Sequence, residues 1–165
     1  MKTTATIASV PNQPGVYALM GGSSANRYFA YVGIAGNLRQ RIVQHLILRD
    51  SSIATGTSAA CLNPDYVTEV RWWLHKKFKR VVNRAAAELV ALKFLDPALR
   101  SRGLSSLDAQ RLFSDPAFKQ EMEALFEGPP SGTLQLPTMQ SIVERLDTVE
   151  RSLERLSATL QKSKG

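Results

Sequence analysis

A length of 165 residues allows one domain of ordinary size with an appendage, but not two full domains. A content of 44% hydrophobic and 21% charged residues excludes a disordered chain, and no apolar run approaches the roughly 20 residues of a membrane span. The formal net charge of +7 favours a polyanionic partner, and the single Cys61 excludes a disulfide framework or a cysteine-based zinc site within one chain. These features predict a cytoplasmic protein with no membrane association.

The first third of the chain predicts a β-hairpin followed by a helix. Two strand-like runs, at residues 15–20 and 28–33, flank a turn rich in glycine and serine. Asn37 can cap a helix that extends to about residue 48, since apolar residues follow it at helical spacing. The small, polar residues at 50–64 predict an exposed loop.

The next segment predicts a third strand and a long helix. Residues 67–74 are β-prone, and residues 77–95 carry an apolar stripe at helical spacing. The strand contains Trp72 and Trp73. We expect one indole in the core, while the other could stack on a base or cover the sheet.

The residues after the core predict a small helical extension and then a linker. Ser114, Asp115 and Pro116 form a typical helix start, with a capping side chain followed by a proline in the first turn. Residues 128–132 are rich in glycine and proline and predict a linker. We therefore assign residues 105–133 to a helical extension with its linker.

The C-terminal residues 134–165 predict a coiled-coil helix that oligomerises. Apolar residues recur in an a/d pattern over about three heptads, which favours self-association through residues 136–162. Leucine at a with isoleucine or valine at d points away from a parallel dimer. The alternative is an amphipathic helix packed on its own domain. The residues of the pattern are Met139, Ile142, Leu146, Val149, Leu153, Leu156 and Leu160.

Five residues of the first region could together carry chemistry. Tyr17 and Tyr31 lie on adjacent strands of the predicted hairpin, and Arg41 and His45 share one face of the predicted helix. Glu88 is an isolated carboxylate in an alanine-rich helix segment. Such a set suffices for metal-assisted phosphodiester cleavage: the carboxylate holds Mg²⁺, arginine offsets phosphate charge, and tyrosine or histidine accepts a proton from water.

Two tripeptides, GVY at residues 15–17 and YVG at residues 31–33, precede an Asn-Leu-Arg-x-Arg helix start. This pattern resembles the GIY-YIG nuclease family, which includes a nuclease domain of a bacterial excision-repair subunit, some homing endonucleases and some restriction enzymes. Glu88 is followed nine residues later by Pro97, similar to the glutamate-to-proline spacing of the family. The resemblance covers about residues 11–102.

The resemblance implies a role for each of the five residues. Tyr17 resembles the candidate general base, and Tyr31 resembles the tyrosine that orients water or phosphate. Arg41 resembles the arginine that faces the phosphate, and His45 falls where the family carries histidine or tyrosine. Glu88 resembles the single ligand of Mg²⁺ or Mn²⁺. Beyond the proline, where the family usually has asparagine, the chain has arginine at position 100.

For residues 1–104 the resemblance implies an α/β fold of the α+β kind, with a small three-stranded antiparallel sheet flanked by helices. We expect a Mg²⁺-dependent endonuclease acting on double-stranded DNA, with the coiled coil joining catalytic units that each cut one strand. The alternative is a catalytically inactive nucleic-acid-binding or scaffolding protein of the same fold.

Residues 27–84 supply the net positive charge, since they hold ten basic and three acidic residues. Such a run of charge could be an ordinary solvated face, but beside a nuclease site we expect contacts with phosphate. The candidate nucleic-acid contacts are Arg39, Lys76, Lys77, Lys79, Arg80 and Arg84.

Overall fold

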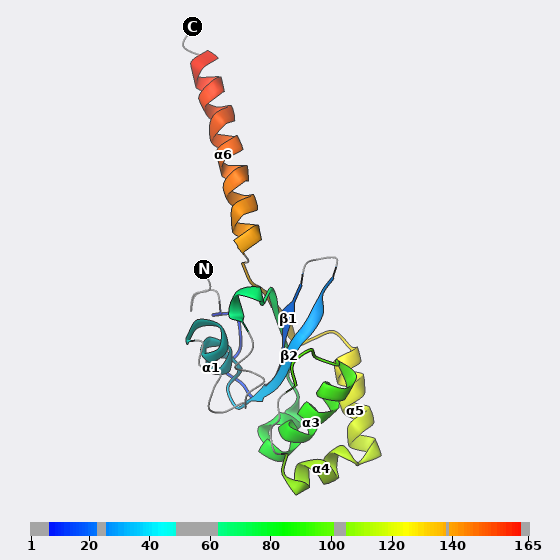
Figure 1. The fold of residues 1–165 in the computed structure, drawn as a ribbon. Helices are drawn as coiled ribbons and strands as arrows, with labels where there is room; N and C mark the ends of the chain where they lie inside the picture. The colour runs from blue at the N-terminus through cyan, green and yellow to red at the C-terminus, as the bar shows by residue number, and fades with distance from the viewer. Residues whose placement is uncertain (1–6, 23–25, 49–62, 101–104, 138, 163–165) are drawn as a thin grey trace. The chain divides into compact units, whose positions relative to one another are not determined.

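The computed structural model describes residues 7–22, 26–48, 63–100, 105–137 and 139–162 (Figure 1). By its internal contacts the chain divides into two units, residues 2–136 and residues 137–165. The predicted loop at 50–64 falls outside the described residues, except for its last two. Within the described part of the chain, no helix is long and apolar enough to cross a membrane.

The first unit is built on a four-stranded antiparallel sheet of order β2-β1-β3-β4. All three predicted strands are confirmed, but the expectation of a three-stranded sheet is wrong. The fourth strand lies partly in the predicted linker, and it is a short edge strand between prolines, without the β-prone run that would reveal it. The strands are β1 (Gly15–Gly21), β2 (Tyr28–Ala35), β3 (Glu69–Trp73) and β4 (Gly132–Gln135).

The sheet has a hydrophobic core on each face, because successive side chains of a strand point to opposite sides. Tyr17 and Tyr31 belong to the core of one face, which also contains Trp72. Val16 and Trp73 belong to the core of the other face. Both indoles are buried, with 6% and 2% of their surface exposed. Neither tryptophan is therefore available to stack on a base.

One face of the sheet is covered by α1 (Leu38–Val43) and the π-helical turn η1 (Gln44–Leu48) that continues it. The predicted helix at 37–48 is thus confirmed, with a wider last turn. Asn37 caps it, since its side-chain oxygen accepts a hydrogen bond from the Gln40 amide at 3.1 Å. The 3-10 turn η2 (Pro64–Tyr66) leads from this side into β3.

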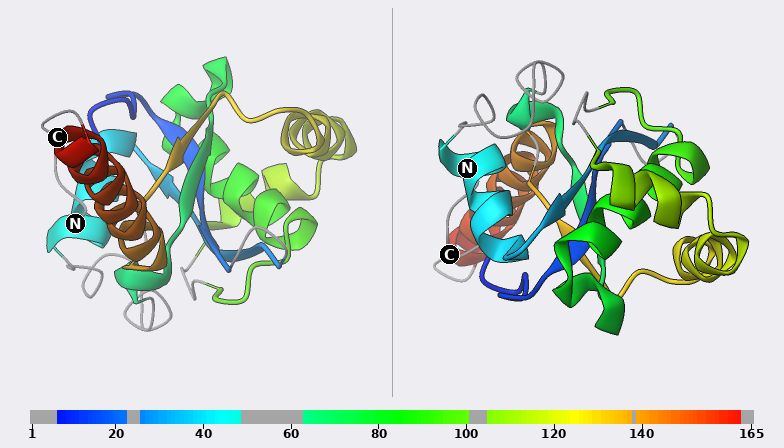
Figure 2. Two further views of the ribbon diagram at one scale, coloured as in Figure 1. Left: turned by 90° about the horizontal axis from the view of Figure 1, so that it is seen from above. Right: turned by 90° about the horizontal axis from the view of Figure 1, so that it is seen from below.

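The other face is covered by three helices, α3 (Val81–Phe94), α4 (Leu107–Phe113) and α5 (Pro116–Glu127), and the 3-10 turn η3 (Lys76–Lys79) precedes α3 (Figure 2). The predicted helix at 77–95 is confirmed from Val81 onward, since the residues before Arg80 form η3 instead, and the helical extension predicted at 105–127 is confirmed as two helices. Buried alanines of α3 let its backbone approach the sheet closely, and Asp115 caps α5 through two backbone amides. The helical extension therefore completes the core of this unit.

The second unit is one helix, α6 (Met139–Lys162). The predicted C-terminal helix is confirmed, although it begins five residues later than expected, because residues 134–135 belong to β4. Its apolar stripe is open to solvent: Leu146, Val149, Leu153 and Leu156 are each between 55% and 61% exposed. A stripe of this kind is typical of a helix that pairs with another helix.

Candidate active site

The two candidate tyrosines lie side by side because of the strand register. Leu19 pairs with Tyr31 and Tyr17 pairs with Gly33, so the two phenols occupy neighbouring positions on one face of the sheet. Their ring centroids are 6.1 Å apart, with the ring planes tilted by 45°. Both side chains are almost completely buried. The sheet therefore holds them as a fixed pair.

His45 completes this aromatic cluster from η1. Its Nε2 atom lies 2.7 Å from the Tyr17 hydroxyl, within hydrogen-bond distance. The imidazole centroid is 5.7 Å from the Tyr17 ring and 5.6 Å from the Tyr31 ring. His45 is fully buried. The structure thus brings together three of the five predicted residues in direct ring contact.

Gly33 provides the space in which the two phenols sit. A Cβ atom on this residue would lie 2.7 Å from the Tyr17 hydroxyl oxygen and 2.9 Å from a ring carbon of Tyr31. Both distances are shorter than a Cβ atom tolerates, and both rings are buried, so the surrounding core would have to shift. Any side chain at this position would therefore displace the candidate catalytic phenols.

The environment keeps both phenols protonated. Burial, with further contributions from Tyr31 and Glu88, raises the pKa of Tyr17 well above its ordinary value, although Arg41 lowers it in part. Burial and the charge of Glu88 raise the pKa of Tyr31 to about 12, again opposed by Arg41. Arg41 and Glu88 therefore lie close enough to both phenols for their charges to act on them.

The imidazole is held in its neutral form. Burial is the larger cause and the charge of Arg41 the smaller cause that lower the pKa of His45 to about 4. The imidazole therefore carries no charge near neutral pH, and one of its nitrogens can accept a hydrogen bond. The contact between Tyr17 and His45 thus joins a neutral phenol to a neutral imidazole.

Arg41 lines a pocket of about 450 Å³ where β2 passes into α1. The walls are residues 34–37 together with Gln40 and Gln44, and Gln44 accepts a hydrogen bond from Arg41 at 3.2 Å. A second guanidinium lies close by. The Nη2 atom of Arg84 is 3.8 Å from the point where a Cβ of Gly36 would stand. The pocket therefore combines open space with positive charge.

Glu88 reaches this site from α3, which packs against β1 and β2. It lies one helical turn after Arg84, so the two side chains share a face of the helix. Its half-buried carboxylate influences both phenols, as their raised pKa values record. A single carboxylate fits Mg²⁺, which proteins commonly hold through one or two carboxylates plus substrate oxygens.

Three of the six predicted nucleic-acid contacts are engaged within the protein, and Arg39 and Lys77 are two of them. Arg39 donates hydrogen bonds to the carbonyls of Val10 and Ala8, at 2.7 and 2.8 Å, and so fastens the segment before β1. Lys77 forms an ion pair with Glu121 of α5. Both side chains thus stabilise the fold, and their contact with DNA stays a prediction.

The other basic candidates lie around the start of α3. Arg84 donates a hydrogen bond from Nη1 to the carbonyl of Phe78, which leaves Nη2 directed toward Gly36. In the described parts of the chain, three exposed residues of this region form no ion pair: Lys76, Lys79 and Arg80.

The segment after α3 closes the outer edge of β2. Asp96 adopts a positive φ of 45° directly after the helix, the conformation that commonly ends helices. Ala98 and Leu99 then donate backbone hydrogen bonds to the carbonyls of Phe29 and Ala30, each at 2.9 Å. Arg100 pairs with the exposed carboxylate of Asp96. It thus lies on the surface beside the β2 edge.

The cluster as a whole pairs two phenols and an imidazole with one guanidinium and one carboxylate, beside a pocket that is open to solvent. Such a set can bind a phosphate, hold a divalent cation and move a proton. The sequence motif contains Gly33, but its packing against the two phenols could not be predicted from the motif, because this contact depends on strand register. The sequence matches no protein-family model and no curated protein.

Proposed function

We propose that this chain is a Mg²⁺- or Mn²⁺-dependent DNA endonuclease with a GIY-YIG-like fold. The single observation that carries the proposal is the buried hydrogen bond between Tyr17 and His45, in a cluster whose pKa values respond to both Arg41 and Glu88. A buried network that combines these chemistries beside an open pocket is costly to fold and is typical of functional sites.

Substrate binding begins with the phosphate. The pocket beside Arg41 accepts a DNA phosphate, and the guanidinium offsets the charge that develops on its oxygens in the transition state. Arg84, whose Nη2 atom lies near Gly36, adds a second positive charge. The basic residues at the start of α3 contact neighbouring phosphates of the strand.

The proton leaves the attacking water through Tyr17. A phenol that retains its own proton can accept another only if it passes the first one on, and His45 Nε2 is 2.7 Å away to receive it. Arg41 contributes to the low pKa of His45. A bound phosphate offsets the Arg41 charge. Substrate binding therefore raises the pKa of His45, and the imidazole accepts the proton from Tyr17 more readily.

Glu88 would hold the divalent cation, with water and phosphate oxygens as the other ligands. When bound, such an ion supplies Lewis-acid stabilisation of the phosphoryl oxygens. Tyr31, next to Tyr17 and under the influence of Glu88, orients the water or phosphate between them. Each of the five residues thus has a separate role.

Oligomerisation belongs to the same proposal. One site cuts one strand, so cleavage of a duplex needs two catalytic units or two visits. The exposed apolar stripe of α6 supports self-association through this helix. We infer that α6 joins catalytic units into a homo-oligomer.

Nicking of supercoiled plasmid tests the proposal. The wild type should convert it to open-circular and linear forms with Mg²⁺ or Mn²⁺, and Glu88→Gln should lower the rate by about 100-fold or more. Glu127→Gln, at the exposed end of α5, is the matched control and should cleave like the wild type.

Absence of nicking by the wild type, or equal nicking by the Glu88→Gln variant, would contradict the enzymatic proposal. If the inactive wild type still bound DNA with an affinity that fell steeply with salt, the chain would instead be the non-catalytic nucleic-acid-binding protein. In that case the same basic residues would bind DNA, and no proton would pass from Tyr17 to His45.

A further inference from the structure

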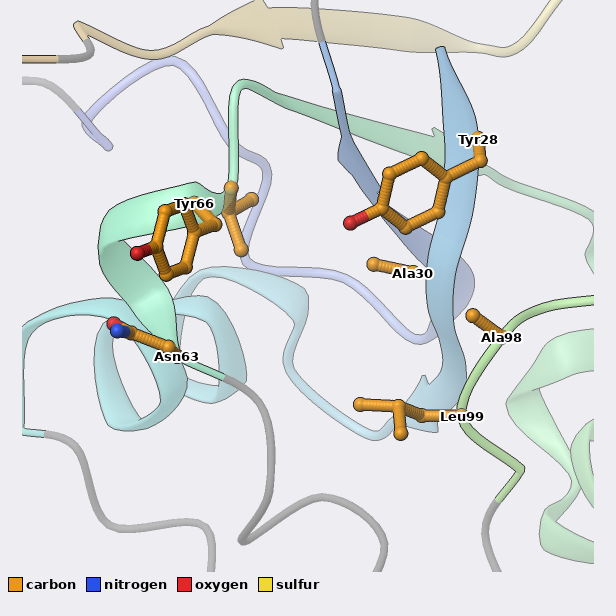
Figure 3. A pocket seen from close by; sticks show the side chains of 7 residues that line it. Tyr28, Ala30, Asn63, Tyr66, Ala98 and Leu99 are labelled. Atoms are coloured by element: carbon orange, nitrogen blue, oxygen red, sulfur yellow. The ribbon is translucent and has the colours of Figure 1, made fainter. Parts of the chain in front are cut away.

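A second pocket has a volume of about 370 Å³ (Figure 3). Val67 and Leu99, which line it, pack in the core on the sheet face that carries Tyr17 and Tyr31. Tyr28 and Tyr66 form opposite walls, and Ala30 and Leu99 contribute apolar surface between them. Asn63 stands at one end. None of the described residues that line it is charged, so it suits a flat, neutral ligand rather than a phosphate.

A β-bulge turns Tyr28 toward this face. Leu19 pairs with Tyr31, but Met20 pairs with Phe29, so Ala30 is an extra residue on β2. Without the bulge, simple alternation along β2 would place Tyr28 on the opposite face of the sheet, the one that α3 covers. With it, Phe29 packs into the α3 side, and Tyr28 lies on the face that carries Tyr31.

The Tyr28 ring packs against the neighbouring strand on one side and is exposed on the other. It lies over Gly21, its cross-strand partner, where a Cβ would be 2.7 Å from the phenol oxygen. Glycine therefore supports one side of the ring, while 48% of the residue surface stays exposed. Tyr66, on η2, is 72% exposed. Two large exposed aromatic residues that border one pocket are typical of a stacking site.

The pocket adjoins the candidate catalytic tyrosine. Leu99 forms a β-bridge with Tyr31 and also lines the pocket, where its backbone bond to Ala30 holds it in place. Along β2, Ala30 of this pocket is four residues from Ile34 of the pocket beside Arg41, or about 13 Å, which corresponds to roughly four base steps of B-DNA. One bound strand can therefore reach both places.

The geometry points to a nucleobase site: this pocket takes one unpaired base of the same DNA strand whose phosphate lies beside Arg41. The inference rests on the proposed function and adds a substrate class, DNA with an unpaired base near the scissile bond. Every base has a π face that can stack on tyrosine. A paired base inside a duplex cannot enter, so the energy of stacking is gained only where the base is already free or is easily extruded.

Asn63 gives this pocket a polar end. Its side-chain oxygen accepts a hydrogen bond from the Asp65 amide at 3.0 Å, so it caps η2 and has a fixed position. The amide nitrogen is a donor that can meet an acceptor on the edge of the base. Aromatic walls and one positioned donor together form a site for a heterocycle.

Binding of the full-length protein to two DNA duplexes, measured in EDTA to prevent cleavage, tests the inference. One duplex is perfectly paired, and the other has the same sequence with a single bulged 2-aminopurine. The wild type should bind the bulged duplex more tightly and quench its fluorescence by stacking. Tyr28→Ala and Tyr66→Ala should each lower affinity for the bulged duplex by about 5- to 100-fold.

The controls separate stacking from folding. Tyr28→Phe and Tyr66→Phe keep the ring and should retain the preference, and the alanine variants should bind the paired duplex like the wild type. Equal wild-type affinity for both duplexes, with paired DNA still bound and nicked, would overturn the base site alone. Equal losses on both duplexes in the alanine variants would also overturn it. Failure of the wild type to bind or nick any DNA would overturn the proposed function as well.

Discussion

His45 is a buried imidazole next to a guanidinium, and folding depends on its staying neutral. Its pKa is about 4 in the folded protein against an ordinary 6.5, so the unfolded chain binds the proton more readily between these values. This contribution to stability is complete above pH 6.5 and is lost as the pH falls toward 4. The change should be of the order of 3 kcal/mol.

Urea unfolding of the wild type and of His45→Gln, measured at intervals from pH 7 to pH 4, tests this. The wild type should lose stability more steeply across that window than the variant. Ile42→Val, in the same core, is the control, since it should lower stability by about 1 kcal/mol at every pH. Parallel curves for wild type and His45→Gln would show that His45 is not buried in neutral form.

Gly33 is the second residue whose role the contacts define. Gly33→Ala should lower stability by about 1–3 kcal/mol and break the Tyr17–His45 hydrogen bond, because its Cβ would overlap both phenols. Gly36→Ala is the matched control, since its Cβ would meet only Arg84, at an ordinary 3.8 Å. Thermal unfolding measures both. Similar melting temperatures for the two variants would mean that the rings are not as closely placed as described.

At the residue scale, the sequence predicted which side chains form the cluster but not what holds them. The motif spacing named Tyr17, Tyr31, Arg41, His45 and Glu88, and their proximity follows from register and helix packing. The orientation of Tyr28 was beyond prediction, since simple alternation fails at the Ala30 bulge. Bulges depend on pairing across strands, which a local pattern does not contain.

Glu69 of β3 links this strand to β4 and to the residue that precedes β2. Its buried carboxylate accepts hydrogen bonds from Arg27, Arg71 and Gln135, at 2.8, 2.5 and 2.8 Å. Burial alone would raise its pKa, but the bonds from Arg71 and Gln135 and the nearby charges outweigh that effect and lower it. Its stabilisation is therefore present above the ordinary carboxyl pKa and is lost as the pH falls below it.

Glu69→Gln should lower the free energy of unfolding by about 2 kcal/mol at pH 7, because a buried acceptor of three bonds loses its charge. Glu121→Gln, at a half-exposed ion pair with Lys77, should cost less than about 1 kcal/mol. Urea unfolding compares the two variants. An equal effect of both substitutions would contradict the assignment of Glu69 as the link between β3, β4 and the start of β2.

At the element scale, the helices and the three longer strands could be predicted because their apolar residues recur at helical spacing or form β-prone runs. Several helices also begin at a recognisable capping residue. Asn37 and Asp115 begin helices as expected. The strand β4 could not be predicted, since its four residues gain stability only by pairing with β3. The π-helical turn at 44–48 was also beyond a pattern that assumes regular helix.

The whole molecule should be an oligomer held by α6. Sedimentation equilibrium should give a multiple of the 18.2 kDa chain mass. Leu153→Asp, within the exposed apolar stripe, should yield a monomer, whereas Thr148→Asp, outside the a/d positions, should not. A protein that ends at Leu136 keeps all of β4 and should be a folded monomer. Persistent oligomerisation of that shortened protein would exclude α6 as the interface.

The most direct test of the central claim is to locate the metal. Crystals of the full-length protein with Mn²⁺ and an uncleavable phosphorothioate duplex should show one anomalous peak bound by the Glu88 carboxylate at about 2.2 Å. The bound phosphate should lie beside Arg41, with the Tyr17 hydroxyl still paired with His45. A phosphate bound elsewhere, or a Glu88 carboxylate directed away from the two phenols and the metal, would contradict the account.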